Sequence, residues 1–285
     1  MKNQTSKPEK EIKKMNLLVT LDSNYVGPLT VLLKSVMITN PEADFDIYVA
    51  HSSLTKEDFE KIKGATDPER TRIHPITVSA ESLEKAPVLK RISKETYYRL
   101  LMMDYLPKTV DRVLYLDPDI VVLSDLSTLY NVDFKGRMLA AASHVKYFIE
   151  DINKIRFKNP KDSRYFNAGV LVVNLEKMRK TVTSEMVFDY IEKNKRWLFL
   201  ADQDVLNGMF GRDMICLDEC IYNLDEKTML YNRRRVRDLS WVEDNVIIVH
   251  YNGKYKPWKE GYKGKLAHFW FRFRDAELKV ADKAK

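Results

Sequence analysis

The sequence predicts an α/β fold in which helices cover a sheet that contains parallel strand pairs. Short apolar runs alternate along the chain with segments whose apolar residues recur at helical spacing, and such alternation is typical of α/β proteins. The chain has 285 residues and is 45% hydrophobic, which is enough for one large domain with a full core. No Gly-, Ser- or Pro-rich linker and no internal repeat divides it.

The first part of the chain predicts three strands and two helices. The strands cover residues 16–21, 47–50 and 72–78. Pro28 opens a helix because its missing N–H costs nothing in a first turn, and the apolar residues from Leu29 to Met37 recur at helical spacing. Thr55 caps a charged helix. Pro75 restricts its strand to a sheet edge or breaks it.

The remainder of the chain continues this alternation. Further strands are predicted at residues 112–116, 139–143, 169–174 and 246–250. Helical periodicity covers residues 93–104 and 176–195, and a further short helix begins at Asp204. Because ligands of open α/β sheets bind beyond the carboxyl ends of strands, the polar residues that follow these strands are candidates for a site.

The net charge of +7 is concentrated at the two ends of the chain. Residues 225–285 hold 15 Lys and Arg against 9 Asp and Glu, and residues 1–14 hold five Lys against two Glu. A local basic surface attracts phosphates, anionic lipid headgroups or nucleic acid, although dispersed lysines are also an ordinary solvated face. Residues 1–14 lack the apolar stretch of a signal peptide, and we expect them to form a flexible leader.

The two cysteines do not indicate a metal site. Cys216 and Cys220 have no second pair and no nearby histidine, so they are a poor zinc site, and we expect reduced thiols in a cytoplasmic protein. No apolar run reaches the roughly 18 residues of a membrane span. We therefore expect a soluble protein that is at most peripheral on the inner face of a membrane.

Two carboxylates follow the predicted strand at 112–116. Asp117 and Asp119 are separated by Pro118, and two carboxylates so placed can share one divalent cation. His250 ends the last predicted strand and is available as a third ligand. Carboxylates suit Mg²⁺ or Mn²⁺, and an imidazole favours Mn²⁺. Asp-Pro-Asp is also a common turn sequence, so the metal site depends on His250 lying nearby.

The residues after His250 predict an anion-binding turn. Gly253 allows close approach of a ligand to the backbone, and Lys256 can reach a phosphate as a point charge. A plain surface turn is the alternative. Because Asp22, Asp117 and His250 each follow a predicted strand, we expect them to converge on one crevice. This combination indicates a metal-bound nucleoside diphosphate.

Six segments occur in the order and spacing of one known family. They are Thr20-Leu21-Asp22-Ser23-Asn24-Tyr25, Tyr98-Arg99-Leu100, Leu114-Tyr115-Leu116-Asp117-Pro118-Asp119, Phe166-Asn167-Ala168-Gly169-Val170, Asp202-Gln203-Asp204 and His250 to Trp258. On these segments the chain resembles glycosyltransferase family 8, the retaining GT-A enzymes that include bacterial lipopolysaccharide galactosyl- and glucosyltransferases and glycogenin. The resemblance implies a GT-A domain over residues 15–260, with a Rossmann-like mixed sheet flanked by helices, followed by a small basic, aromatic tail at 261–285.

The resemblance also implies which residues bind the nucleotide of a UDP-sugar. Asp22 and Asn24 would hold the uracil and ribose, Tyr25 would stack near the base, and Thr20 belongs to the same segment. Asp and Asn after a strand are otherwise ordinary turn formers.

Other positions would bind the diphosphate, the metal and the donor sugar. Gly253 and Lys256 would bind the diphosphate, and Arg99 would contact the sugar or the diphosphate. Asn167 would donate a hydrogen bond to the sugar. The metal ligands would be Asp117, Asp119 and His250.

The catalytic positions implied by the resemblance are Asp202 and Gln203, beside the anomeric carbon. Glycosyl transfer passes through an oxocarbenium-like transition state, and a metal ion with Lys256 would stabilise the departing UDP. An amide such as that of Gln203 is a feeble nucleophile, which favours attack on the same face within an ion pair. A covalent intermediate stays the alternative.

The donor sugar and the acceptor are not determined by these residues. His144 lies roughly where relatives carry an acidic residue near the sugar hydroxyls, so UDP-glucose and UDP-galactose both stay open. The tail segment from His268 to Arg274 combines Arg with Trp and Phe, which is typical of a membrane-interfacial segment or of an aromatic segment buried against the domain. The expected activity is transfer of a hexose to a glycan or lipid-linked acceptor in cell-surface polysaccharide synthesis.

Two other functions compete with this one. A basic module binding nucleic acid through residues 225–285 has no recognisable motif and leaves Asp117, Asp119 and His250 unexplained, so we expect no nucleic-acid partner. A degenerate transferase that binds the donor without turnover conflicts with the presence of every expected metal and phosphate residue.

Overall fold

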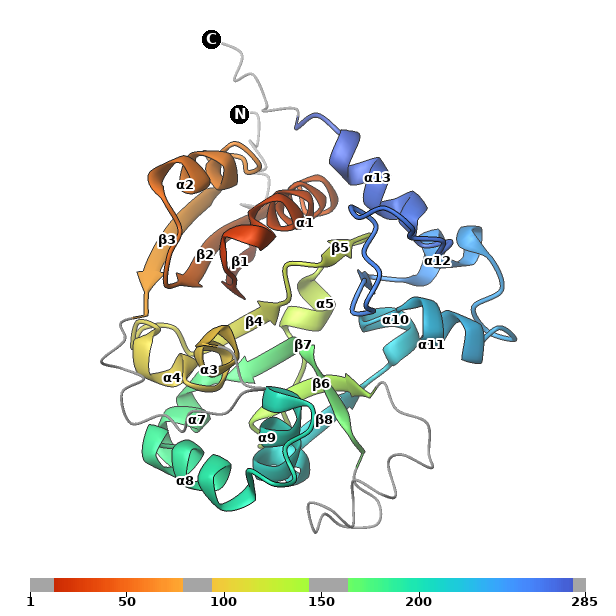
Figure 1. The fold of residues 1–285 in the computed structure, drawn as a ribbon. Helices are drawn as coiled ribbons and strands as arrows, with labels where there is room; N and C mark the ends of the chain where they lie inside the picture. Colours follow the sequence, from red (N-terminus) through yellow and green to blue (C-terminus); the bar gives the residue numbers. More distant parts are fainter. Residues whose placement is uncertain (1–12, 79–93, 144–163, 279–285) are drawn as a thin grey trace, which may run out of the picture.

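The computed structural model describes residues 13–78, 94–143 and 164–278 (Figure 1). Within them, a central sheet of seven strands runs in the order β3-β2-β1-β4-β7-β6-β8. Its strands are β1 (Lys13–Thr20), β2 (Ala43–His51), β3 (Thr71–Thr77), β4 (Arg112–Leu116), β6 (Leu139–Ser143), β7 (Phe166–Asn174) and β8 (Met214–Leu217). A second sheet in the same residues pairs β5 (Ile120–Val122) with β9 (Ile248–His250).

The central sheet is mixed, as the sequence predicts. Strand β1 pairs in parallel with β2 and β4, and β2 pairs in parallel with β3. Strand β7 runs antiparallel to both β4 and β6, and β6 is parallel to β8. The prediction for Pro75 is confirmed, because β3 is an edge strand of the sheet, where a residue without an N–H is tolerated.

Helices cover both faces of the sheet. They are α1 (Val26–Thr39), α2 (Lys56–Lys63), α3 (Lys94–Leu100), α4 (Met102–Tyr105), α5 (Ser127–Tyr130), α7 (Leu175–Thr181), α8 (Ser184–Asn194), α9 (Ala201–Phe210), α10 (Glu219–Tyr222), α11 (Glu226–Tyr231), α12 (Leu239–Asn245) and α13 (Ala267–Asp275). The 3₁₀ turns η1 (Ser23–Tyr25) and η3 (Gly211–Asp213) complete the described elements.

Alternating residues of the strands divide the core into two layers. In β4, Val113 and Tyr115 join the cluster formed with α3, α4 and α7–α9, whereas Leu114 and Leu116 join the cluster with α1, α2 and α5. Side chains of a strand point alternately to opposite faces, so an apolar strand of this kind must be covered on both sides. Figure 1 shows α1 and α2 on one side of the sheet and α7 to α9 on the other.

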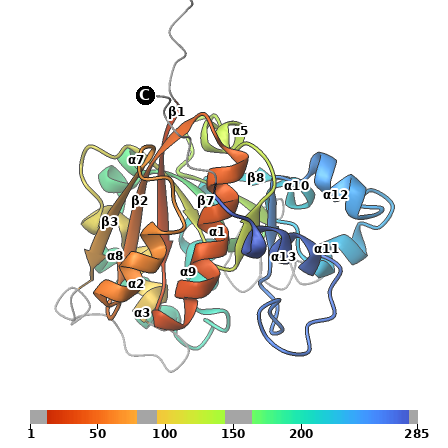
Figure 2. The same cartoon turned by 90° about the horizontal axis from the view of Figure 1, so that it is seen from above.

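A third core cluster joins the small sheet to the C-terminal helices. Helix α13 packs against α1 and β5, and Figure 2 shows it beside α1. Phe269, Trp270 and Phe273 are buried in this cluster, whereas Phe271 is 37% exposed. For those three residues, the structure therefore supports the buried aromatic segment rather than the membrane-facing one.

Several element boundaries differ from the sequence prediction. The helix predicted over 176–195 is broken between α7 and α8, because Thr183 accepts a hydrogen bond from the Met186 N–H and starts a new helix. The strand predicted over 246–250 is reduced to β9 and lies outside the main sheet. Elements β5, β8, α5 and α10 to α12 have no sequence prediction. His144, Ser93, the first twelve residues and residues 279–285 lie outside the described residues.

Among the described helices, none combines the length and the apolar character required to cross a bilayer.

Candidate active site

The carboxylate of Asp117 is held by the strand that precedes it. Tyr115 is fully buried in β4, and its hydroxyl donates to Oδ1 of Asp117 at 2.6 Å. The Tyr115 hydroxyl also lies 3.1 Å from Oγ1 of Thr20, at the end of β1. The Asp117 N–H donates to the carbonyl of Gly169 in β7 at 2.8 Å. Three adjacent strands therefore fix the position of this carboxylate.

Pairing of β5 with β9 brings His250 to the carboxylates. His250 is the register partner of Ile120, and the N–H of Tyr251 donates to the carbonyl of Asp119 at 2.9 Å. The imidazole Nε2 lies 3.2 Å from Oδ1 of Asp119 and 3.6 Å from Oδ2 of Asp117. One ligand atom from each of Asp117, Asp119 and His250 lies within 4.8 Å of the other two. Of the three residues expected to converge, Asp117 and His250 therefore lie together, and Asp22 lines a cavity with Asp117.

Burial and charge act in opposite directions in this cluster. Burial disfavours the charged imidazole, but the nearby carboxylates of Asp119 and Asp117 raise the pKa of His250. Burial likewise disfavours ionised Asp119, but the charges of His250 and Lys256 lower the pKa of that carboxyl to about 2. The site therefore keeps a carboxylate ionised in an interior position, where a cation offsets the cost of burial.

The hydrogen bonds of His250 leave Nε2 facing the carboxylates. Nδ1 lies 2.8 Å from Oδ1 of Asn223, and the same amide donates from Nδ2 to Oδ1 of Asn167 at 3.0 Å. Because an amide oxygen only accepts, Nδ1 carries a proton, and in the neutral imidazole Nε2 offers its lone pair to a cation. Two carboxylates and one such imidazole fit a divalent cation such as Mn²⁺ or Mg²⁺.

Gly169 allows β7 to pass directly under the metal-binding candidates. A Cβ built on Gly169 would lie 2.3 Å from Cε1 of His250 and 2.7 Å from Oδ2 of Asp117. Both distances are shorter than the contacts that real Cβ atoms make, so another residue at this position would displace His250, Asp117 or the strand itself. The glycine in Phe166-Asn167-Ala168-Gly169 is therefore required by close packing and not by a turn.

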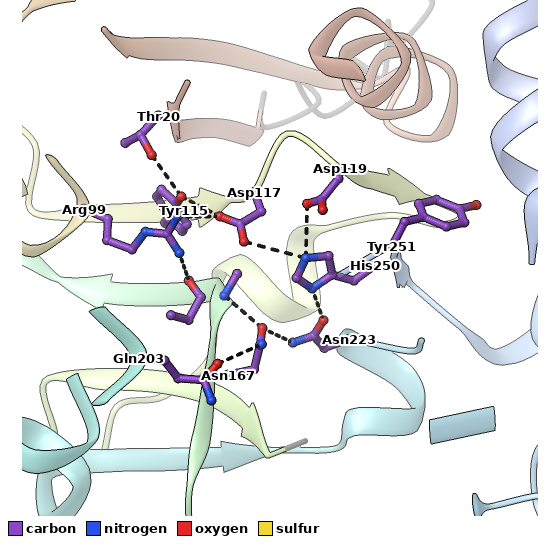
Figure 3. A network of polar contacts seen from close by, with 12 residues as sticks. Thr20, Arg99, Tyr115, Asp117, Asp119, Asn167, Gln203, Asn223, His250 and Tyr251 are labelled. Atoms are coloured by element: carbon purple, nitrogen blue, oxygen red, sulfur yellow. Dashed lines mark hydrogen bonds and ion pairs between the residues drawn. The ribbon is translucent and has the colours of Figure 1, made fainter. Parts of the chain in front are cut away.

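A row of hydrogen-bonded amides connects His250 to Gln203 (Figure 3). Asn223 contacts both His250 and Asn167, and Nδ2 of Asn167 donates to Oε1 of Gln203 at 3.2 Å. Oδ1 of Asn167 also accepts from the Gly169 N–H at 2.9 Å. Asn223 has no sequence prediction, since an Asn before an acidic turn carries no distinct signal. The bridge between Leu224 and Val249 places it beside β9.

Arg99 links the carboxylates of two separate segments. Its guanidinium lies 3.1 Å from Oδ1 of Asp117 and 2.8 Å from Oδ2 of Asp202. Burial raises the pKa of Asp202, and the charge of Arg99 opposes that rise. Burial disfavours the charged guanidinium, but Asp117 and Asp202 raise the pKa of Arg99. The carboxylate of Asp202 is thus engaged in an ion pair.

Lys256 and Gly253 lie on the loop after β9. Nζ of Lys256 contacts Oδ2 of Asp119 at 2.5 Å and the carbonyl of Tyr251 at 2.6 Å. The ammonium group predicted to reach a phosphate therefore lies directly against a metal-ligand candidate. Gly253 is exposed and lines a neighbouring cavity.

Two cavities meet at the carboxylate pair. One, of about 300 Å³, is lined by Thr20, Asp22, Tyr25, Arg99, Asp117 and Asp119. The other, of about 290 Å³, contains Arg99, Asp117, Asp119, Asn167, Asp202, Gln203 and His250 in its wall. Asn24 lies beside the first cavity, because its N–H donates to Oδ1 of Asp22 at 2.9 Å. The structure thus offers two cavities that share Arg99, Asp117 and Asp119 in their walls.

Comparisons with known proteins identify the family of the chain. The family model described as Glycosyl transferase family 8 matches residues 16–261. A lipopolysaccharide 1,2-glucosyltransferase of Escherichia coli is 28% identical over 259 residues, covering 88% of this chain and 75% of the relative.

Solved structures of a galactosyltransferase also resemble the chain. The galactosyltransferase LgtC, in complex with donor and acceptor sugar analogues, is 26% identical with a TM-score of 0.76, covering 91% of this chain and 95% of LgtC. An active-site mutant of LgtC, in which glutamate replaces a glutamine, is also 26% identical, covers 91% and 95%, and has a TM-score of 0.75.

Proposed function

The chain belongs to glycosyltransferase family 8 and is a hexosyltransferase of the GT-A fold, and we propose that it moves glucose or galactose from a UDP-sugar to a glycan or glycolipid acceptor with retention of configuration. The observation that carries this proposal is the Asp117, Asp119 and His250 cluster, because its two carboxylates line both cavities. A nucleotide-sugar has two unlike halves joined by a diphosphate, and this arrangement offers a place for each part.

The residues that would hold a divalent cation are Asp117, Asp119 and His250. An ion bound there would neutralise the negative charge that develops on the diphosphate as the glycosidic bond breaks. The imidazole ligand supports Mn²⁺ as the metal, with Mg²⁺ as the alternative. Lys256 already contacts Asp119, so its ammonium stands where it can add positive charge beside the leaving group.

The linings of the two cavities support one orientation of the bound UDP-sugar. The cavity with Asp22, Asn24 and Tyr25 beside it takes the uridine, and the cavity with Asn167 and Gln203 takes the hexose. Arg99 lines both cavities and is placed to contact the sugar or the diphosphate. Gly253 follows the metal-ligand candidate His250 by three residues and supplies exposed backbone to the diphosphate.

The residues around the hexose cavity favour same-face attack. Asp202 is paired with Arg99 and is therefore less available as a nucleophile, while the amide of Gln203 is a weak nucleophile. We assign Gln203 to stabilising the positive charge of the oxocarbenium-like transition state through its carbonyl oxygen. The proton of the acceptor hydroxyl then passes to the leaving phosphate. LgtC also has a glutamine in its active site, as the mutant named above states.

The acceptor and the setting are further parts of this proposal. One relative is named as a lipopolysaccharide glucosyltransferase and another as a galactosyltransferase. These names support synthesis of a cell-surface glycan, and both glucose and galactose stay candidates for the donor sugar. The free thiols of Cys216 and Cys220 are compatible with the cytoplasm. Contact of the tail with a membrane rests on its exposed residues, Phe271 and Arg274.

Release of UDP from UDP-glucose and from UDP-galactose tests this function. Each donor is incubated without acceptor, once with Mn²⁺ and once with EDTA. We expect slow hydrolysis of one donor that EDTA stops. Absence of hydrolysis, together with absence of metal-dependent UDP binding in calorimetry, would reject the proposal.

A further inference from the structure

A larger cavity lies beside the hexose cavity, and apart from His250 and Gly253 in its wall it has no role in the function described so far. It has a volume of about 780 Å³ and lies between the start of α11 and the loop of residues 251–264. His250 and Asn252 line both this cavity and the hexose cavity. Figure 2 shows the loop between β9 and α13 beside α11. A molecule in this cavity would therefore lie next to the candidate reaction centre.

The two carboxylates in the wall of the cavity, those of Asp225 and Glu226, accept hydrogen bonds from neighbouring groups of the protein. Oδ1 of Asp225 accepts from the Thr228 N–H at 2.6 Å, and Asp225 is 6% exposed. Oε1 of Glu226 accepts from the Tyr262 hydroxyl at 2.9 Å and from the Leu266 N–H at 2.7 Å. These bonds hold both acidic groups in the wall of the cavity.

The packing at Gly264 shows how closely the loop fits this wall. A Cβ on Gly264 would lie 2.2 Å from Oε1 of Glu226. A larger residue at this position would have to displace the Glu226 carboxylate, which the Tyr262 hydroxyl and the Leu266 N–H hold in place.

Three lysines line the same cavity, and all are exposed. They are Lys227, Lys254 and Lys263. In the part of the chain that the structure describes, none of the three forms an ion pair, whereas Lys256 is engaged by Asp119. Nζ of Lys254 lies 5.8 Å from the ring centre of Tyr255, another exposed lining residue. The three ammonium groups outnumber the two carboxylates in the wall, and an anion would be favoured in the cavity.

We propose that this cavity binds an anionic group, a phosphate or a carboxylate, carried by the acceptor glycan. The inference rests on the proposed transferase function and names the class of its second substrate. The donor diphosphate is the alternative anion. Of the residues proposed for it and its metal, Gly253 and His250 line this cavity, whereas Asp117, Asp119 and Lys256 do not. A sugar whose hydroxyl faces the hexose cavity could extend its charged substituent toward Lys254 and Lys263.

The experiment compares three probes on protein saturated with UDP and Mn²⁺, so that the donor site is filled. Glucose, glucose 6-phosphate and glucuronic acid are titrated, and ligand-observed NMR reports the dissociation constant of each probe and whether UDP stays bound. The variant carries Lys227→Gln, Lys254→Gln and Lys263→Gln together. A matched control carries Lys259→Gln and Lys265→Gln, two exposed lysines that do not line the cavity.

We expect at least one anionic probe to bind about tenfold more tightly than glucose, because hydrogen bonds to charged groups are the stronger ones. The triple variant should lose this difference, and the control should keep it. A preference for glucose 6-phosphate identifies a phosphate, and one for glucuronic acid identifies a carboxylate.

Equal behaviour of the three probes, including no binding by any of them, would overturn the inference, as would an anionic preference that survives in the triple variant. Displacement of UDP by the anionic probe would place the anion at the diphosphate and would also contradict it. Binding of UDP with Mn²⁺ is recorded first in the same sample. Its failure would count against the transferase function itself, and its success with a failed probe would count against the acceptor site alone.

Discussion

The two sides of the candidate metal cluster are held in place by different chemistry. On one side, the carboxylates of Asp117 and Asp119 contact the charged or ionisable groups of Arg99, Lys256 and His250, in addition to the hydrogen bond that Asp117 accepts from Tyr115. On the other side, the row from His250 to Gln203 is held by neutral amides. Charged groups attract each other over a distance and tolerate small changes in geometry, whereas hydrogen bonds between side-chain amides weaken when donor and acceptor are not aligned. We infer that the charged side decides whether metal and diphosphate bind, and that the amide side decides how the hexose lies.

Removal of a carboxylate should give the largest effect. Asp119→Asn and Asp117→Asn should each reduce transfer by at least about 100-fold, because the charge that holds the cation is lost. Activity, Mn²⁺ binding and circular dichroism are measured together, with Asp244→Asn on an exposed helix end as control. Full activity of either variant with metal still required would show that the altered residue is not a ligand.

The change Gln203→Ala tests the far end of the amide row. Turnover should fall roughly 100-fold, the size seen when a group stabilising the transition state is removed. The KM for the UDP-sugar should change little, and UDP binding should not change. An equal loss in turnover and in donor affinity would make Gln203 a binding residue only.

Two changes at Asn223 separate its two hydrogen bonds. Asn223→Ala removes both, and Mn²⁺ affinity should fall about 10-fold or more, as for other partners of metal-binding histidines. Asn223→Asp keeps an acceptor for His250 but loses the donor to Asn167. It should therefore bind Mn²⁺ nearly as the wild type does and still turn over more slowly. Parallel losses of Mn²⁺ affinity and turnover in the two variants would contradict separate roles for the two bonds.

The pH dependence should have opposite signs for stability and for metal binding. Because the pKa of His250 is raised in the folded protein, its contribution to stability is complete below its unfolded value, about 6.5. That contribution is lost as pH rises through the folded pKa. The metal-free protein should therefore melt at a lower temperature as pH rises through this window, while Mn²⁺ binds more tightly because a ligand must be deprotonated.

Calorimetry of thermal unfolding and Mn²⁺ titration across that pH window test whether the melting temperature falls and the Mn²⁺ affinity rises as pH increases. His268→Gln changes an exposed histidine far from the site and should keep the wild-type profile. Loss of both trends in His250→Gln is expected. Wild-type trends in His250→Gln would assign them to another group.

The sequence predicted the charged side better than the amide side, for a physical reason. Asp117 and Asp119 follow an apolar run that must be buried, so their position at a strand end follows from local pattern. Asn223 reaches its place only through the bridge of Leu224 to Val249 and the pairing of β5 with β9. Strand β5 has three residues, too few for a periodic signal, and such non-local pairings cannot be read from a short segment.

The C-terminal segment illustrates a different limit. Arg with interleaved Trp and Phe has the same composition whether it faces lipid or packs on a domain. Residues 269, 270 and 273 of α13 face the core, and this choice depends on the surfaces of α1 and β5 that receive them. Composition alone could therefore not decide between the two alternatives.

The measurement that tests the central claim most directly is an anomalous difference map at the manganese edge, from crystals grown with Mn²⁺ and UDP. We expect one peak about 2.1 Å from Nε2 of His250 and at a similar distance from carboxylate oxygens of Asp117 and Asp119, with UDP extending toward Asp22. A peak elsewhere, or UDP bound with no peak at these three residues, would contradict the assignment of the metal site.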